Sequence, residues 1–248
     1  MSTSDVDFGR RHAARDFGEA TSRCFDLLIA ATALVVLAPL FLAAMAAVCI
    51  EGGRPLFFAQ MRLGRGGRPF VMYKFRKFGA ASGTGGCPLT VAGDRRLTRV
   101  GAFLAATKLD ELPQLWNVLR GDMAIVGPRP ESMAFADCFR GGFEPVLDFK
   151  PGLLGPSQIH FRNECRFYPA DADPTRFYRE VLFPAKARLD LAYFPTRTRT
   201  SDVAMLIRGV LAVLGWTPSG QATHDQTVAA DNRLPDLLGA ANRKTGAP

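Results

Sequence analysis

The chain has 248 residues, of which 48% are hydrophobic and 22% charged. This composition excludes a wholly disordered chain and an ordinary polytopic membrane protein, and the length suffices for one large or two small domains. The 31 basic residues exceed the 23 acidic ones by eight, which favours a partner that carries phosphate: nucleic acid, anionic lipid or a phosphorylated substrate.

The first two segments are a polar one and an apolar one. Residues 1–22 are polar and charged, and we expect a mobile lead-in or a surface helix. Within residues 23–52, the run Leu27–Ile50 contains 24 residues and no charge. A helix of that length measures about 36 Å, which exceeds the roughly 30 Å of a bilayer's hydrocarbon core. The sequence therefore predicts a membrane-embedded segment over residues 23–52.

The sequence allows two topologies for this segment. Basic residues flank it on both sides, so the usual excess of positive charge on the cytoplasmic side gives no direction. Pro39 lies in the middle of the run, where it removes a backbone hydrogen bond and bends a helix. These features fit a re-entrant helix-break-helix that enters and leaves by one face. A kinked single span fits the composition equally well.

Residues 53–216 form the predicted globular part, which begins with a β-hairpin. The β-prone runs Leu56–Arg62 and Phe70–Phe78 flank a glycine-rich turn. Strand alternation puts Lys74 and Arg76 on one face and Phe75 on the other. We expect the two cations to contribute positive charge to a phosphate site, although solvated strand positions are the simpler interpretation.

The rest of the globular part is predicted to be mainly helical. Residues 101–119 are predicted to be helical, with a new helix beginning near Asp110 because proline, here Pro113, is tolerated only in a first turn. For the last predicted helix, over Asp202–Trp216, packing in the core is favoured over lying on a membrane. The remaining predictions are a loop over Pro145–Gly155, amphipathic helices over Phe177–Tyr193 and Asp202–Trp216, and a disordered tail over residues 217–248.

Asp110 and Glu111 are the candidate catalytic pair. Neighbours on a helix point about 100° apart, so the two carboxylates would not share one proton and can take separate tasks. An ionised aspartate can attack phosphorus, and a neighbouring glutamate can hold Mg²⁺ together with substrate phosphate. The alternative is an acidic pair that stabilises the dipole at a helix start, and the local sequence alone favours it.

Arg129 is the candidate phosphate ligand. It stands between two prolines, which hold it on a stiff extended stretch. A stiff arginine suits bidentate phosphate binding because it loses less freedom on binding; a rigid connector with a solvated arginine is the alternative. The five cysteines and three histidines are scattered without metal-ligand or redox spacing, which favours reduced thiols in a cytosol-facing protein.

Together these stretches resemble the bacterial sugar transferase family, that is, the monotopic phosphoglycosyl transferases or polyprenyl-phosphate hexose-1-phosphate transferases. The resemblance extends in order from about Arg23 to Trp216. The matching motifs are Phe57–Gln60 with Arg62 and Gly64, Lys74–Arg76, Asp94–Gly101, Leu109–Met123, Val126–Pro130, Lys150–Gly152, and Leu189–Leu191 with Tyr193.

The resemblance implies transfer of a sugar-1-phosphate from a nucleoside diphosphate sugar, usually UDP-linked, to polyprenyl phosphate, with release of UMP. Asp110 would be the nucleophile that forms a covalent phosphosugar intermediate, Glu111 would bind the catalytic Mg²⁺, and Arg129 would bind the nucleotide or its phosphate. The helix broken at Pro39 would be re-entrant, with the catalytic part on the cytoplasmic face of the bacterial inner membrane. The expected fold is α+β, mainly helical, with one small β-hairpin.

Three positions depart from the family pattern. Ala38 replaces a serine before the helix-breaking proline, and residues 154–158 differ from the usual loop sequence. Ala105 stands where an arginine that helps to hold phosphate is usual, with Lys108 as the nearest substitute; one lost charge-assisted contact costs about 1.5–3 kcal/mol.

Two rival functions follow from these observations. One is a non-catalytic, membrane-anchored family member that acts as a scaffold for anionic lipid or a partner enzyme, which Ala105 favours. The other is a nucleic-acid binder, which rests on net charge alone, since the chain has no recognisable binding motif. The sequence leaves open the sugar, the glycan and the oligomeric state, including a homodimer.

Overall fold

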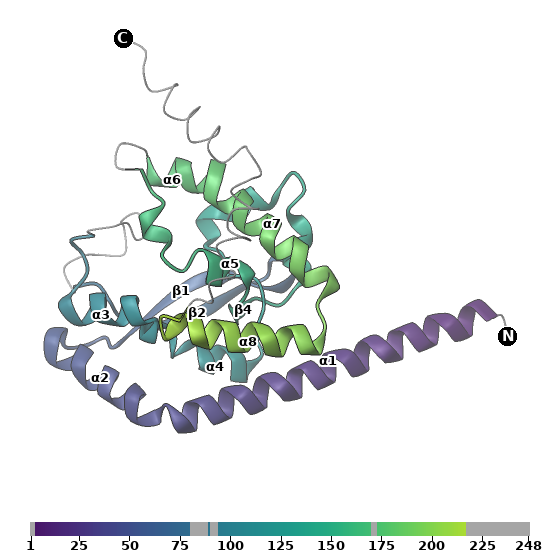
Figure 1. Cartoon of the computed structure of the whole chain (residues 1–248), viewed down its shortest axis with the longest axis horizontal. Helices are drawn as coiled ribbons and strands as arrows, with labels where there is room; N and C mark the ends of the chain where they lie inside the picture. Colours follow the sequence, from purple (N-terminus) through teal and green to yellow (C-terminus); the bar gives the residue numbers. More distant parts are fainter. Residues whose placement is uncertain (1–2, 80–88, 90–93, 170–172, 217–248) are drawn as a thin grey trace, which may run out of the picture.

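The computed structural model describes residues 3–79, 89, 94–169 and 173–216. It is mainly helical with two small sheets (Figure 1), as the predicted α+β class requires; the predicted tail lies outside the described residues. The main elements are α1 (Thr3–Val36), α2 (Ala38–Gly52), β1 (Phe57–Leu63), β2 (Pro69–Phe75), α3 (Arg99–Thr107), α4 (Gln114–Arg120), β3 (Ala124–Val126), β4 (Gly152–Leu154), α5 (Pro156–His160), α6 (Pro174–Phe177), α7 (Phe183–Tyr193) and α8 (Arg199–Val213).

The first two helices form a bent pair along one side of the molecule (Figure 1). α1 continues without a break across residue 23, the predicted boundary between the polar and apolar segments. The bend between α1 and α2 is 63°, and it falls at Leu37, just before Pro39 in the first turn of α2. Among the described residues, no single helix is long and apolar enough to cross a membrane, whereas the bent pair meets that requirement jointly.

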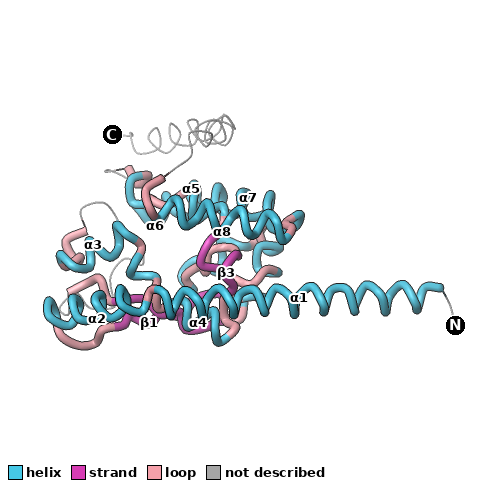
Figure 2. Tube along the Cα trace, turned by 60° about the horizontal axis from the view of Figure 1, so that its bottom comes forward, coloured by secondary structure: helices cyan, strands magenta, loops and turns pink. Residues whose placement is uncertain are grey.

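Polar contacts join α1 to the globular part. The Arg23 guanidinium donates to the carbonyl oxygens of Val118 and Leu119, at 2.5 and 2.6 Å. These carbonyls belong to the last turn of α4, where helical hydrogen bonds run out; the Val118 oxygen also accepts from the Gly121 N–H at 3.0 Å. Asp26 accepts a hydrogen bond from the backbone N–H of Ile125 at 2.9 Å. Figure 2 shows α1 passing alongside α4 at this level.

The predicted hairpin is confirmed. β1 pairs antiparallel with β2, with Phe57 opposite Phe75, although β2 ends three residues before the predicted run does. The side chain of Asn117, which is fully buried at 0% exposure, ties the hairpin to α4: it donates to the Val71 carbonyl at 2.7 Å and accepts from the Tyr73 N–H at 3.1 Å. Both hydrogen-bonding ends of this buried amide are therefore satisfied.

A second, parallel sheet was not predicted. β3 pairs with β4, with Ala124 opposite Gly152 and Val126 opposite Leu154. The expected loop over residues 145–155 therefore contains a strand in its last part, and its first part lies in a 3₁₀ helix (Glu144–Asp148). Three-residue strands carry too little alternation to be recognised in a sequence. The backbones approach so closely that a Cβ on Gly152 would lie 2.1 Å from the Gly127 nitrogen. This contact holds the segment after β3 against the start of β4.

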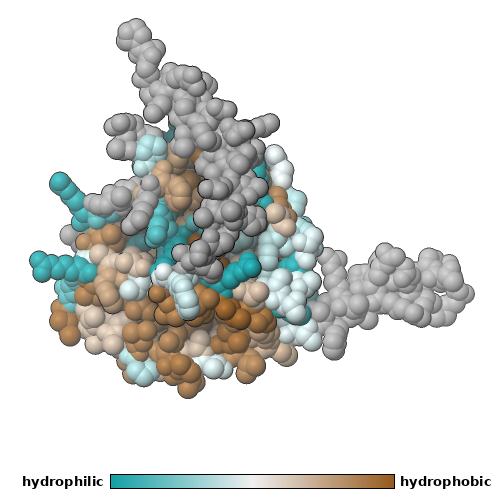
Figure 3. Space-filling view, viewed as in Figure 1, coloured by the Kyte–Doolittle hydropathy of each residue, from teal (hydrophilic) through white to brown (hydrophobic). Residues whose placement is uncertain are grey.

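The last helix is apolar on two faces. α8 packs on the core through Met205, Gly209 and Ala212, whereas Leu214 and Trp216 of the predicted helix are exposed at 75% and 70%. The expected core packing therefore holds for one side of the helix only, and mostly through other residues than the apolar ones that suggested it. Its other side leaves Val203, Ile207 and Val210 about half exposed, at 43%, 55% and 48%. Figure 3 shows apolar residues gathered along the edge of the molecule formed by α1, α2 and α8. An exposed apolar area of this kind marks an interaction surface.

Candidate active site

A left-handed turn presents the acidic pair. α3 ends at Thr107, and Lys108 adopts φ = 62°, the one positive φ of a non-glycine residue in the described ranges. Asp110 and Glu111 then lie in a short 3₁₀ turn (Leu109–Glu111) rather than in the α-helix predicted to begin near Asp110. Left-handed backbone at a lysine is costly, and such conformations concentrate at functional sites.

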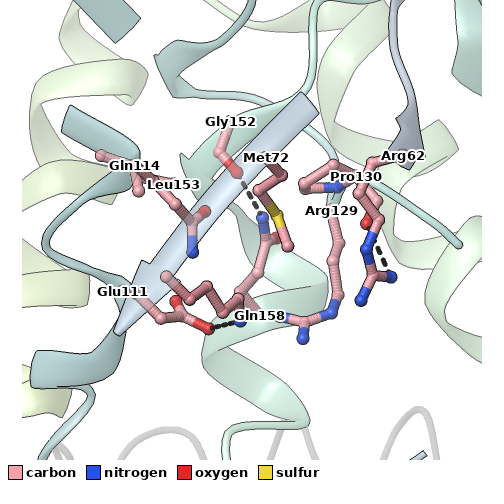
Figure 4. A pocket seen from close by; sticks show the side chains of 10 residues that line it. Arg62, Met72, Glu111, Gln114, Arg129, Pro130, Gly152, Leu153 and Gln158 are labelled. Atoms are coloured by element: carbon pink, nitrogen blue, oxygen red, sulfur yellow. Dashed lines mark hydrogen bonds and ion pairs between the residues drawn. The ribbon is translucent and has the colours of Figure 1, made fainter. Parts of the chain in front are cut away.

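Glu111 lies in a small, mainly polar pocket beside this turn (Figure 4). The pocket gathers residues from both hairpin strands, the acidic turn, α4, the proline-flanked arginine and the β4 region. Its lining residues are Arg62, Met72, Lys74, Glu111, Gln114, Arg129, Pro130, Gly152, Leu153 and Gln158.

Lys74 and Glu111 form an ion pair at the pocket, with 2.7 Å between Nζ and Oε1. Their side chains are 12% and 19% exposed, so the pair is largely desolvated. Burial acts to raise the pKa of Glu111, but the positive charges of Lys74, Arg129 and Lys108 outweigh it and hold that pKa well below its ordinary value. Glu111 is therefore an anion at neutral pH.

Asp110 lies next to the pocket but is not among its lining residues. Its side chain is buried, at 3% exposure, and its Oδ1 finds no hydrogen-bond partner in the part of the chain that the structure describes. Burial raises the pKa of Asp110, against the opposing effect of Lys74. The two neighbouring carboxylates thus have pKa values shifted in opposite directions, which suits them to different tasks.

Arg129 supplies the second cation of the pocket. Burial acts to lower its pKa, yet the carboxylates of Glu111, Glu164 and Glu131 outweigh burial and raise it. The guanidinium is drawn among the pocket side chains in Figure 4. It is a permanently charged, planar donor next to Glu111, which is the arrangement that phosphate recognition uses.

The structure separates the other two predicted phosphate ligands from the pocket lining. Lys108 interacts electrostatically with Glu111, while burial lowers the pKa of its ammonium. Arg76 lies elsewhere: β2 ends at Phe75, so the strand alternation that would align Arg76 with Lys74 stops there. Its guanidinium donates instead to the Gly53 carbonyl, at 3.0 Å, just beyond α2.

Four polar residues of this region were missed by the site prediction. Arg62, Gln114 and Gln158 line the pocket, and Gln158 is held by hydrogen bonds from Nε2 to the carbonyls of Gly127 and Gly152, at 3.2 and 3.1 Å. Lys77 interacts with Asp110, and burial together with the charge of Lys74 lowers the pKa of its ammonium to about 8. The sequence feature that could have indicated Lys77 is its position directly after the motif Lys74–Arg76.

The acidic pair is the place where a divalent metal ion could bind. Within the described ranges, no group of three or more histidine, cysteine, aspartate or glutamate residues is arranged to hold a metal. Mg²⁺ does not need such a cage, because it binds through one or two carboxylates, water and substrate phosphate. The Glu111 carboxylate and the unpaired, buried Oδ1 of Asp110 are a donor set of this kind.

The comparison with known proteins identifies the family. Residues 17–216 match the family model described as bacterial sugar transferase, and the chain belongs to that family. The match includes the bent helix pair from residue 17 onward and every residue of the pocket.

Curated relatives share about a third of their aligned residues with the chain. A UDP-N-acetylgalactosamine-undecaprenyl-phosphate N-acetylgalactosaminephosphotransferase of Aeromonas hydrophila is 34% identical over 77% of this chain and 43% of its own length. A UDP-glucose:undecaprenyl-phosphate glucose-1-phosphate transferase of Caulobacter vibrioides is 33% identical over 77% of this chain and 69% of its own. The exopolysaccharide production protein ExoY of Sinorhizobium fredii is 36% identical over 66% of this chain and 80% of its own.

Proposed function

We propose that the chain transfers a sugar-1-phosphate from a nucleoside diphosphate sugar, with uridine as the nucleoside, to polyprenyl phosphate, and thereby initiates polysaccharide or glycoconjugate synthesis. The observation that carries the proposal is the acidic pair: Asp110 and Glu111 have oppositely shifted pKa values beside a pocket that contains Lys74 and Arg129. The names of the relatives from Aeromonas and Caulobacter describe the same class of reaction.

In the first step, a carboxylate oxygen of Asp110 attacks the phosphorus that carries the sugar. The new bond joins that oxygen to phosphorus, the bridging P–O bond of the diphosphate breaks, and UMP leaves with the electron pair. The raised pKa of Asp110 makes its carboxylate a more basic nucleophile. Lys74 and Arg129 stabilise the negative charge on the phosphate oxygens during this transfer.

In the second step, an oxygen of polyprenyl phosphate attacks the same phosphorus. The bond to Asp110 breaks, the carboxylate is restored, and the product is a polyprenyl diphosphate sugar. Glu111 would hold Mg²⁺, which when bound supplies further positive charge to the phosphate oxygens. The lowered pKa of Glu111 keeps this side chain ionised for that task.

A burst assay tests the two-step reaction. Purified protein mixed with a panel of UDP-sugars and Mg²⁺, without lipid acceptor, should release UMP up to one equivalent per protein for the accepted sugar, because the first step needs no acceptor. Added polyprenyl phosphate should convert the burst into continuous turnover. UMP release that depends strictly on acceptor would contradict the covalent intermediate, and no release from any UDP-sugar would favour the scaffold function.

The proposed location is the cytoplasmic face of the bacterial inner membrane, with α1 and α2 re-entrant. The support is the 63° bend, the basic residues on both flanks and the exposure of Val35, Val36 and Leu42 around the bend, at 76%, 68% and 63%. Apolar side chains in such numbers at a bend are costly in water and favourable in lipid.

Cysteine labelling tests this topology. Single cysteines introduced as Thr21→Cys and Arg54→Cys, in a chain whose native cysteines are replaced by serine, should react with an impermeant reagent from the same side of sealed vesicles. A cysteine in a fused cytoplasmic reporter protein serves as the control for vesicle orientation. Labels on opposite sides would show that the pair spans the membrane.

A further inference from the structure

Two partly buried arginines lie side by side in the pocket. Arg62 comes from β1 and Arg129 from the proline-flanked segment, and both line the pocket; Figure 4 draws their guanidinium groups at the same end of it. Backbone pairing brings the two segments together, since the Leu63 N–H donates to the Glu131 carbonyl at 2.9 Å and Arg62 forms a bridge with Ser132. The fold therefore holds two like charges together in a partly buried place.

The hydrogen bonds of Arg62 leave part of its guanidinium unused. One Nη donates to the Gln60 side chain at 2.7 Å, and the other makes a long contact of 3.4 Å to the Pro130 carbonyl. Its Nε is buried without a hydrogen-bond partner among the described residues. Burial and the charge of Arg129 lower the pKa of Arg62. An anion bound between the two guanidinium groups would give the buried Nε of Arg62 a hydrogen-bond acceptor. It would also offset the repulsion between the two positive charges.

A buried carboxylate, that of Glu131, acts electrostatically on both arginines. Glu131 is only 7% exposed. The Tyr178 hydroxyl donates to Glu131, and burial with this carboxylate raises the pKa of Tyr178 well above its ordinary value, so the hydroxyl keeps its proton.

Tyr178 begins a π-helical turn (Tyr178–Leu182) between α6 and α7, a distortion that frequently occurs at functional sites. Its side chain is 2% exposed, and its hydroxyl lies 3.4 Å from the Lys186 ammonium. The hydrogen bond from Tyr178 thus helps to fix the position of the Glu131 carboxylate.

We propose that Arg62 joins Arg129, for which the family resemblance already implies nucleotide or phosphate binding, in a two-guanidinium subsite for the nucleotide-side phosphate of the nucleoside diphosphate sugar. We further propose that Glu131 is a positioning residue that orients the pair. This inference rests on the proposed function. In the view of Figure 4, Glu111 lies at the end of the pocket away from Arg62. The sugar-side phosphate would lie near Glu111 and Asp110, which leaves the nucleotide-side phosphate for the arginines.

A binding measurement tests Arg62 without requiring catalysis. Inorganic pyrophosphate, which needs no base recognition, is titrated calorimetrically into the full-length protein in detergent. Arg62→Gln should weaken its binding at least about tenfold, equivalent to about 1.4 kcal/mol. Arg68→Gln is the matched control, because Arg68 lies exposed in the turn of the same hairpin and loses the same charge. Equal affinities for Arg62→Gln and the native protein, or no binding by the native protein, would overturn the subsite.

The Glu131 variants separate orientation from charge. Coulomb's law alone predicts that Glu131→Gln, which removes a negative charge beside an anion site, strengthens pyrophosphate binding. Orientation of the arginines by Glu131 predicts the reverse: at least about fivefold weaker binding, a similar rise in KM for the nucleotide sugar and little change in kcat. Tyr178→Phe should shift the same quantities in the same direction, and Glu131→Asp should restore part of the affinity.

Stronger or unchanged pyrophosphate binding by Glu131→Gln would overturn the positioning role, provided that circular dichroism shows a native fold. If this variant does not fold, pyrophosphate binding by Tyr178→Phe serves as the test instead, and stronger or unchanged binding by that variant would overturn the role. Failure of the proposed function gives a different pattern. In that case pyrophosphate binding would still depend on Arg62, while no UDP-sugar released UMP.

Discussion

Replacing Asp110 by asparagine is expected to abolish the covalent phosphosugar adduct and to lower UMP release by at least about a thousandfold, the scale of losing a nucleophile. The amide has nearly the shape of the carboxylate but no ionised oxygen for attack on phosphorus. Intact-protein mass spectrometry after incubation with the accepted UDP-sugar should show the added mass on the native protein and none on Asp110→Asn. An adduct of unchanged yield on the variant would remove Asp110 as the nucleophile.

The same variant should fold at least as stably as the native protein. Burial raises the pKa of Asp110 in the folded state, so its contribution to stability is present in acid and is lost as the pH rises through that folded-state pKa. Asparagine carries no charge and avoids this loss at neutral pH. Thermal unfolding at pH 7 should therefore show an equal or higher Tm, and Asp148→Asn, at an exposed aspartate, is the matched control for activity.

Replacing Glu111 by glutamine is the second change with a large expected effect. The amide oxygen can still accept the hydrogen bond from Lys74, but the negative charge that would bind Mg²⁺ and that supports Arg129 is removed. We expect initial rates to fall about a hundredfold or more, and the remaining rate to depend on a much higher Mg²⁺ concentration. Titration of Mg²⁺ at saturating UDP-sugar measures both effects.

Two variants make this result specific. Glu111→Asp keeps the charge and should retain more of the Mg²⁺ response than Glu111→Gln does. Glu180→Gln removes a charge at an exposed i,i+4 ion pair with Arg176, where little energy is at stake, and should behave as the native protein. A Mg²⁺ titration curve that is identical for Glu111→Gln and the native protein would exclude Glu111 as the metal ligand.

Local sequence patterns predicted the parts of the fold that depend on local chemistry. Pro39 predicted the helix break, the glycine-rich turn after Arg62 predicted the hairpin, and Gly121 predicted the end of α4, where it adopts φ = 93°. The parallel β3–β4 pair could not be predicted, because strands of three residues are defined by a partner distant in the sequence. The left-handed turn at Lys108 was also missed, since lysine is not a residue that favours it.

Site residues that belong to one compact sequence motif could be predicted. Site residues that reach the pocket only through the pairing of segments distant in the sequence could not. Asp110, Glu111 and Arg129 belong to compact motifs, and the structure brings Glu111 and Arg129 together with Lys74 in one pocket. Arg76 was misplaced because the end of β2 cannot be located to the residue from sequence alone. Arg62 reaches the pocket because β1 pairs with the segment around Ser132, and the sequence alone does not indicate this pairing.

The contacts of Arg23 and Asp26 with the globular part have a consequence for how the molecule works at a surface. In the membrane-bound arrangement proposed above, these hydrogen bonds would restrict tilting of the globular part relative to α1, which a loose linker would not do. The height of Asp110 above the lipid boundary would then be set by the protein itself, so a water-soluble sugar donor and a lipid acceptor would meet at a constant depth.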